Sequence, residues 1–169
     1  MARNQPKVED IIKKAVEAGR MSAERTARDA YKATEKRLYA LPILRKKAVD
    51  DRERLQELKA YGPREKSKSI VRFQRSGTRL TPDEIMEMLV LDIEATIAAD
   101  MYEIETVEKA LADISGDPYY FTVTGRYEED LTDEQVAEQI PCDTTTVWRN
   151  RKRLVQRVAI RLYGADAVK

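Results

Sequence analysis

The residues best suited to chemistry lie near the end of the chain, where cations and hydroxyls recur along one predicted helix. At helical spacing, one face of this helix carries Thr145, Arg149, Lys152 and Gln156. Arginine and lysine donate hydrogen bonds to guanine acceptors in the DNA major groove, and threonine offers a hydroxyl and a methyl group to base edges. We therefore predict that Thr145, Arg149 and Lys152 contact bases.

Side chains on the flanks of the same helix extend this candidate site. Arg151, Arg153 and Arg157 are predicted to meet phosphates, which position a protein on DNA without reading its sequence. Trp148 is included as a candidate contact, although packing is the commoner role of a lone helical tryptophan. The full predicted DNA-binding set is Thr144, Thr145, Trp148, Arg149, Arg151, Lys152, Arg153 and Arg157.

Two helices joined by a tight turn are predicted to hold this face. Thr132 and Gln135 form a capping box, Asp143 caps the second helix, and Pro141 ends the first because proline has no amide hydrogen. Apolar residues fall where a helix-turn-helix needs buried side chains, at Leu131, Val136, Ala137, Ile140, Val147, Leu154 and Val158. Such a motif places its second helix in a DNA groove, whereas the charge run alone equally suits a solvated basic helix of a bundle.

The same segment resembles a known family. DPYYFTVTGRYEEDLTDEQVAEQI and TTVWRNRKRLVQRVAIRLYG are similar to the ArpU/RinA-type regulators of phages and prophages, whose C-terminal part is similar to sigma-factor region 4. The matching positions are Tyr119, Tyr120, Arg126, Tyr127, Leu162, Tyr163 and Gly164. The resemblance covers the last third of the chain and implies a DNA-binding transcription regulator that often acts on late phage genes. Pro141 departs from the glycine frequent at such turns, which leaves the angle of the second helix open.

Charge is segregated along the chain, although 31 basic and 30 acidic residues nearly balance. Residues 1–80 hold 22 Lys and Arg against 11 Asp and Glu, residues 81–143 hold 2 against 18, and residues 144–169 hold 7 against 1. The regional net charges are therefore +11, −16 and +6. Binding to a polyanion depends on the local field, so the basic ends suit DNA. The acidic block either masks these ends or simply covers solvated helices.

Hydrophobic spacing predicts a long helix in the N-terminal region. Six glycines, six prolines and 36% charged residues favour helices over sheets. Apolar residues recur at intervals close to three and four at Tyr31, Leu38, Leu41, Leu44, Ala48, Leu55 and Leu58. Pro42 interrupts this run, which predicts either two helices or one kinked helix.

Another long helix is predicted to begin at Thr81, with Pro82 at its first position and Glu84 completing the capping box. Heptad spacing follows at Ile93, Ile97, Ile104, Val107, Leu111 and Ile114, with Asp100 at one seam position. This seam requires a partner, either the N-terminal helix of the same chain or the equivalent helix of a second copy. A homodimer would suit two half-sites on DNA.

These elements divide the chain into three predicted regions. Residues 1–80 form a basic helical region whose end, 61–80, is a linker or a phosphate-tracking arm. Residues 81–116 form the acidic long helix, and residues 117–169 form the helix-turn-helix domain. There YYFTVT has a strand-like composition, but Tyr120, Val123 and Tyr127 share a helical face and predict a helix. The expected fold is all-α, with extended N-terminal helices, as a helical hairpin or coiled coil, before the helix-turn-helix.

The residue types present also disfavour several functions. With no histidine and one cysteine, a zinc site, a histidine base and an intrachain disulfide are excluded or disfavoured. We expect no enzyme activity, no cofactor and no metal. No apolar run approaches membrane-spanning length and the N-terminus lacks a signal-peptide core, so the expected location is the cytoplasm of a bacterial host.

Two functions from different classes remain. In the first, a transcription regulator recognises a promoter-proximal site on double-stranded DNA, while its N-terminal helices dimerise or contact host RNA polymerase. In the second, the protein is a phage DNA-packaging component that resembles a terminase small subunit and forms rings. The oligomeric state would separate the two functions, since a monomer or dimer suits the regulator and a ring of many copies suits packaging.

Overall fold

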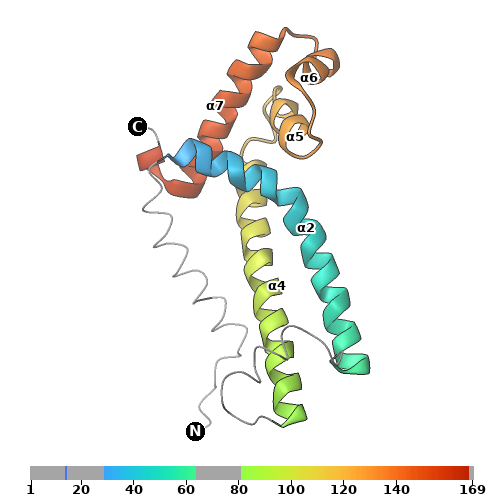
Figure 1. Ribbon diagram of the computed structural model, residues 1–169. Coiled ribbons are helices and arrows are strands. Elements are labelled where there is room, and N and C mark those ends of the chain that lie inside the picture. The colour runs from blue at the N-terminus through green and yellow to red at the C-terminus, as the bar shows by residue number, and fades with distance from the viewer. Residues whose placement is uncertain (1–13, 15–28, 64–80, 168–169) are drawn as a thin grey trace.

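The computed structural model describes residues 14, 29–63 and 81–167, and this part of the chain is all-helical. Its elements are α2 (Ala30–Tyr61), α4 (Pro82–Ala112), α5 (Phe121–Tyr127), α6 (Asp133–Gln139), α7 (Thr144–Tyr163) and a short 3-10 helix η1 (Ala165–Ala167). α2 and α4 form an elongated hairpin, and α5, α6 and α7 gather at one end of it (Figure 1). The predicted all-α class is confirmed, with long helices before the C-terminal helices.

α2 is a single helix that changes direction along its length. Pro42 lies inside it, has no amide hydrogen to donate and crowds the preceding turn. Figure 1 shows the first part of α2 crossing α7 and the top of α4, and the remainder running beside α4. Of the two arrangements left open by the sequence, the structure has the bent single helix.

α4 begins where the sequence predicts. The Glu84 carboxylate accepts a hydrogen bond from the Thr81 amide at 2.7 Å, and Thr81 Oγ1 accepts one from the Glu84 amide at 3.3 Å. Pro82 occupies the first helical position, where a missing amide hydrogen costs nothing. The capping box therefore fixes the start of α4.

The apolar seam of α4 packs against α2 of the same chain. Val107 and Leu111 share one hydrophobic core with Leu38 and Leu41, and these four side chains are at most 4% exposed. Asp100, the polar seam position, accepts a hydrogen bond from Lys47 of α2 at 2.5 Å. For the described residues, the partner helix that the seam requires is α2.

Opposite charges also join the two long helices. Arg37 donates to both carboxylate oxygens of Glu103 at 2.6 and 3.1 Å, and both side chains are only 14% exposed. Farther along the hairpin, Lys59 donates to Glu94 at 2.8 Å in a more exposed pair. The basic and acidic blocks of the sequence therefore neutralise each other in part across this interface.

One face of the second half of α7 is buried in the core formed with α2, α4 and α5. Leu154, Val155, Val158 and Ala159 have no exposed surface, and each such apolar side chain larger than alanine contributes roughly 1.5–3 kcal/mol through burial. This core crosses the predicted boundary between residues 116 and 117. The C-terminal helices thus rest on the hairpin.

The predicted linker or arm at 61–80 lies outside the described residues, except for its first three. α2 ends at Tyr61, and Gly62 follows with a φ of +76°, a conformation that glycine adopts without steric cost. The N-terminal residues before Asp29 are likewise outside, apart from Lys14. Among the described helices, none combines the length and the apolar content that a membrane crossing requires.

The charged contacts of the hairpin predict unequal stability losses. Arg37→Ala removes the guanidinium from a largely buried Glu103, so the free energy of unfolding should fall by about 3 kcal/mol. Lys59→Ala breaks an exposed pair and should cost less than about 1 kcal/mol. Urea unfolding followed by circular dichroism measures both, and equal losses would contradict this account of the hairpin.

Candidate nucleic-acid interface

The helix-turn-helix is built from α6 and α7, with the helix starts that the sequence predicts. Gln135 Oε1 accepts a hydrogen bond from the Thr132 amide at 2.8 Å, and Thr132 Oγ1 accepts one from the Gln135 amide at 3.4 Å. Asp143 Oδ1 accepts from the Thr146 amide at 2.8 Å. That bond lowers the pKa of the Asp143 carboxyl, so the cap stays anionic at the positive end of α7.

The turn between these helices needs no left-handed residue. Ile140 is extended, with φ −108° and ψ 123°, and the Cys142 amide donates to the Ile140 carbonyl at 2.6 Å. Pro141 does not have a positive φ. Pro141 therefore fits without strain at the turn position where glycine is frequent in such motifs. The extended Ile140 and the tight turn after it set the angle between α6 and α7.

α5, α6 and α7 pack closely against one another behind the exposed face of α7. Val136 and Val147 are fully buried, as predicted, whereas the predicted core residues Leu131, Ala137 and Ile140 are only partly buried. Gly125 of α5 lies against α6, and a Cβ atom there would come within 3.2 Å of Val136 Cγ2. Glycine therefore permits the close approach of α5 and α6.

Arg126 and Tyr127 hold α5 in place. Arg126 Nη1 donates to the Leu131 carbonyl at 3.1 Å, and the Tyr127 hydroxyl donates to Glu35 of α2 at 2.8 Å. Burial, and then the Glu35 carboxylate, raise the pKa of Tyr127 far above its ordinary value. Tyr127 therefore stays a neutral donor that ties α5 to α2.

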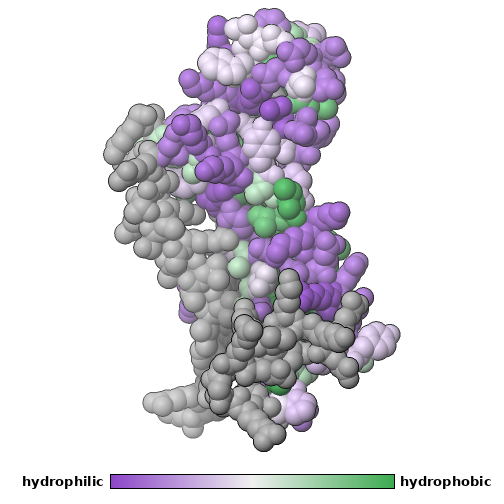
Figure 2. Space-filling view, in the orientation of Figure 1, coloured by the Kyte–Doolittle hydropathy of each residue, from purple (hydrophilic) through white to green (hydrophobic). Residues whose placement is uncertain are grey.

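The first half of α7 presents most of the predicted contact face to solvent. Thr144, Thr145, Arg149 and Lys152 are exposed, and Trp148 is 50% exposed. The Lys152 ammonium lies 5.2 Å from the centroid of the Trp148 ring, within the range of a cation–π contact. This half of α7 projects beyond the hairpin (Figure 1), and Figure 2 shows a predominantly hydrophilic surface at that end of the molecule.

Gln156, predicted to lie on the same face as Arg149 and Lys152, is partly covered by another part of the chain. Its Nε2 donates to the Ala167 carbonyl at 2.5 Å, and the residue is half-buried. The chain after α7 turns back through η1 and covers this position. Helical periodicity alone gives no information about that cover.

Two of the predicted phosphate contacts are held in bidentate ion pairs. Arg151 donates to both carboxylate oxygens of Asp133 in α6, and its side chain is only 12% exposed. Arg153 donates to both oxygens of Asp117, at 2.9 and 3.0 Å, and is 45% exposed. Arg151 therefore ties α7 to α6, and Arg153 ties α7 to the turn after α4.

Arg157 has a looser contact than its two neighbours. Its Nη1 lies 3.8 Å from Asp117 Oδ2, which is too far for a hydrogen bond, and its side chain is 51% exposed. Among the predicted contacts, the cations outside bidentate pairs are thus Arg149, Lys152 and Arg157. These three side chains can donate to an external acceptor.

Asp117 and Asp133 are the residues whose role here the sequence did not reveal. Asp117 lies 36 residues from Arg153, and Asp133 lies 18 residues from Arg151. Local spacing rules connect residues three or four apart on a helix, so they do not link either aspartate to its arginine. One signal in the sequence pointed to such pairs, namely the acidic block at residues 81–143 directly before the basic helix α7.

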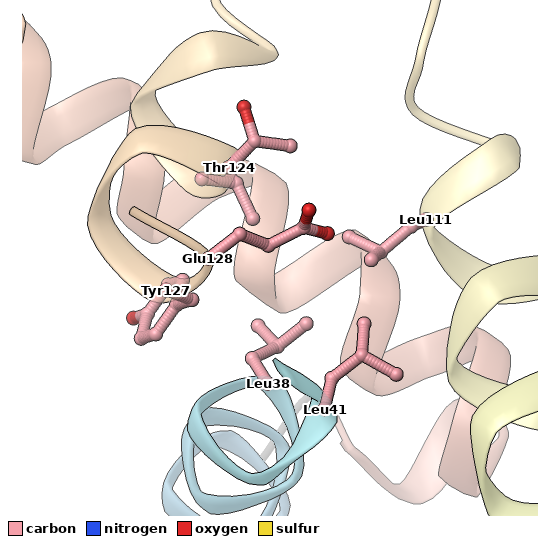
Figure 3. A pocket seen from close by; sticks show the side chains of 7 residues that line it. Leu38, Leu41, Leu111, Thr124, Tyr127 and Glu128 are labelled. Atoms are coloured by element: carbon pink, nitrogen blue, oxygen red, sulfur yellow. The ribbon is translucent and has the colours of Figure 1, made fainter. Parts of the chain in front are cut away.

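A narrow crevice lies where α2, α4 and α5 meet (Figure 3). It is lined by Leu38, Leu41, Leu111, Val123, Thr124, Tyr127 and Glu128. Most of these side chains belong to the hydrophobic core, and Glu128 already accepts a hydrogen bond from Arg45 at 3.3 Å. The crevice is therefore a seam in the packing.

Comparisons with known proteins find no family model, curated protein or solved structure that matches this chain. The candidate interface therefore rests on its own geometry. That geometry presents hydroxyls, cations and one indole ring at the free end of a helix, and the other end of this helix is anchored in the core.

Neighbouring arginines of α7 should differ in their effect on stability. Arg151→Ala breaks the half-buried link to Asp133 and should lower the free energy of unfolding by about 2 kcal/mol. Arg149→Ala removes an exposed side chain and should change it by less than about 0.5 kcal/mol. Thermal unfolding of both variants beside the wild type tests this prediction. An Arg151→Ala variant as stable as the wild type would show that the Arg151–Asp133 pair is dispensable for folding.

Proposed function

We propose that this chain is a sequence-specific DNA-binding protein that regulates transcription, with the first half of α7 as its recognition helix. The observation that carries the proposal is the exposed face of Thr145, Arg149 and Lys152 on a helix whose second half is fixed in the core. A helix fits the major groove of B-form DNA, where arginine and lysine donate to guanine and threonine meets thymine methyl groups.

The pattern of burial supports this role over that of an ordinary solvated helix. A helix that only covers a core has its buried stripe along its whole length. α7 instead buries several residues on one face of its second half, including Leu154, Val155 and Val158, whereas Val147, which is backed by α6, is the one buried residue of its first half. The first half of α7, supported by α6, therefore projects as a rigid element, which suits recognition in a groove.

The resemblance of the last third of the chain to ArpU/RinA-type regulators extends the proposal to phage or prophage genes in the cytoplasm of a bacterial host. In such a role α7 contacts DNA, and the hairpin of α2 and α4 can contact a second partner, either RNA polymerase or another copy of the chain. Ile43 is 70% exposed and Tyr39 is 41% exposed near the bend of α2. Figure 2 shows an apolar patch on this face of the molecule.

Substitutions on the proposed recognition face should weaken DNA binding without unfolding the protein. Arg149→Ala and Lys152→Ala should each reduce the affinity for a selected site by about tenfold or more, since a good bidentate base contact is worth roughly 1–3 kcal/mol. The selected site is taken from fragments of the encoding genome that the wild-type protein retains. Fluorescence anisotropy of a labelled duplex with this site then measures the affinity.

Matched changes elsewhere on the surface provide the controls. Arg54→Ala on α2 and Lys109→Ala on α4 remove the same kinds of exposed cation far from the free end of α7. These variants should bind as the wild type does. The proposed function fails if the wild type binds no duplex even at low ionic strength, or if the control variants lose as much affinity as the recognition-face variants.

The mass of the protein in solution separates regulation from packaging. The α4 seam is filled by α2 of the same chain, so the hairpin has no need of further copies. We expect a monomer or dimer by light scattering coupled to size-exclusion chromatography. A ring of many copies would favour a packaging component over a regulator.

A further inference from the structure

A row of arginines runs along the flank of α7 that faces the turn after α4. Arg153, Arg157 and Arg161 are spaced four residues apart and so lie on one side of the helix. Opposite them, Asp117 holds Arg153 and lies 3.8 Å from Arg157, while Asp113 lies 2.9 Å from Arg161. Two carboxylates therefore face three guanidinium groups on this flank.

The hydrogen bonds of Arg153 leave it little capacity for another acceptor. Its Nε and Nη2 donate to Asn150 Oδ1 at 3.3 and 3.0 Å, and its Nη1 and Nη2 donate to Asp117 at 2.9 and 3.0 Å. A guanidinium has five N–H donors, and these bonds use four of them. A DNA phosphate would have to displace Asp117 before it could bind Arg153 well.

Asp117 is itself held in the orientation that this pairing needs. The Tyr119 amide donates to its Oδ1 at 3.0 Å, and its side chain is only 12% exposed. The hydrogen bonds from Arg153 lower the pKa of the Asp117 carboxyl. The carboxylate is therefore a fixed anion beside the recognition face at neutral pH.

We propose that Asp117 is a specificity-determining residue that withholds Arg153, and more weakly Arg157, from DNA phosphates. This inference rests on the proposed function. Phosphate contacts supply most of the affinity for DNA of any sequence, whereas base contacts discriminate between sequences. By occupying two flanking cations, Asp117 lowers affinity for all duplexes and leaves Thr145, Arg149 and Lys152 to select the site.

A purely structural role for Asp117 makes the opposite prediction. If the pair only braces α7 against the turn, its loss loosens the recognition helix and weakens binding to every duplex. If Asp117 withholds cations, its loss strengthens binding to duplexes of unrelated sequence. The sign of the change therefore separates the two roles.

The test compares Asp117→Asn with the wild type on a short duplex of random sequence, by anisotropy over a series of salt concentrations. Asp117→Asn should bind several-fold more tightly, and its plot of log affinity against log salt should be steeper by about 1 to 2, since each phosphate contact adds roughly 0.9 to that slope. Its preference for the selected site over the random duplex should fall.

Asp113→Asn is the matched control, because it removes the same charge from the same flank. Its partner Arg161 lies twelve residues beyond Arg149, about 18 Å along the helix at 1.5 Å per residue. This variant should leave the salt slope close to that of the wild type. An equal change in both variants would mean that net charge alone acts, and would overturn the inference.

Arg153→Gln provides a second measurement that does not depend on the folding of Asp117→Asn. In the wild-type background it should leave the salt slope unchanged, whereas in the Asp117→Asn background it should lower the slope by about 1. A slope lowered by about 1 in the wild-type background would show that Arg153 already contacts phosphate. If the wild type binds DNA and Asp117→Asn binds no more tightly, the inference is refuted and the proposed function still stands.

Discussion

Burial of the second half of α7 is the constraint on which the rest of the structure depends. Leu154, Val155 and Val158 have no exposed surface and join a core made with α2, α4 and α5. A helix fixed over its last turns transmits that fixed orientation to its first turns, because the backbone hydrogen bonds of an α-helix make it a stiff rod. The exposed face around Arg149 therefore has a defined direction relative to the hairpin.

Electrostatic pairing decides which cations of this basic helix remain available. α7 carries six arginines and lysines and no acidic residue, yet Arg151 and Arg153 are already in bidentate pairs with aspartates. The two pairs lie on opposite flanks and brace the helix between α6 and the turn after α4. A count of basic residues consequently overstates the charge that a polyanion would meet, and the position of each acidic neighbour matters as much as the count.

Sequence reasoning succeeded where the determining contacts are local. The capping boxes at Thr81 and Thr132, the cap at Asp143 and the seam of α4 all depend on residues within one or two helical turns, and the structure has them as predicted. The exposed positions of Thr145, Arg149 and Lys152 followed from helical periodicity anchored on the buried Val147.

The features that the sequence did not reveal depend on contacts between distant parts of the chain. Gln156 is covered by η1, Arg151 is paired with Asp133, and the alternatives for α2 and for the seam partner were settled by tertiary packing. None of these contacts leaves a spacing signal in one sequence. The hydrophobic core also joins residues on both sides of the predicted region boundaries.

The position of Trp148 has a spectroscopic consequence. The chain contains a single tryptophan, and its indole is half exposed beside Lys152 on the free end of α7. Light emitted by this ring under selective excitation comes from one known place, whereas the eight tyrosines are spread through the molecule. The protein thus carries its own optical reporter, which senses occupancy of that surface with no attached dye.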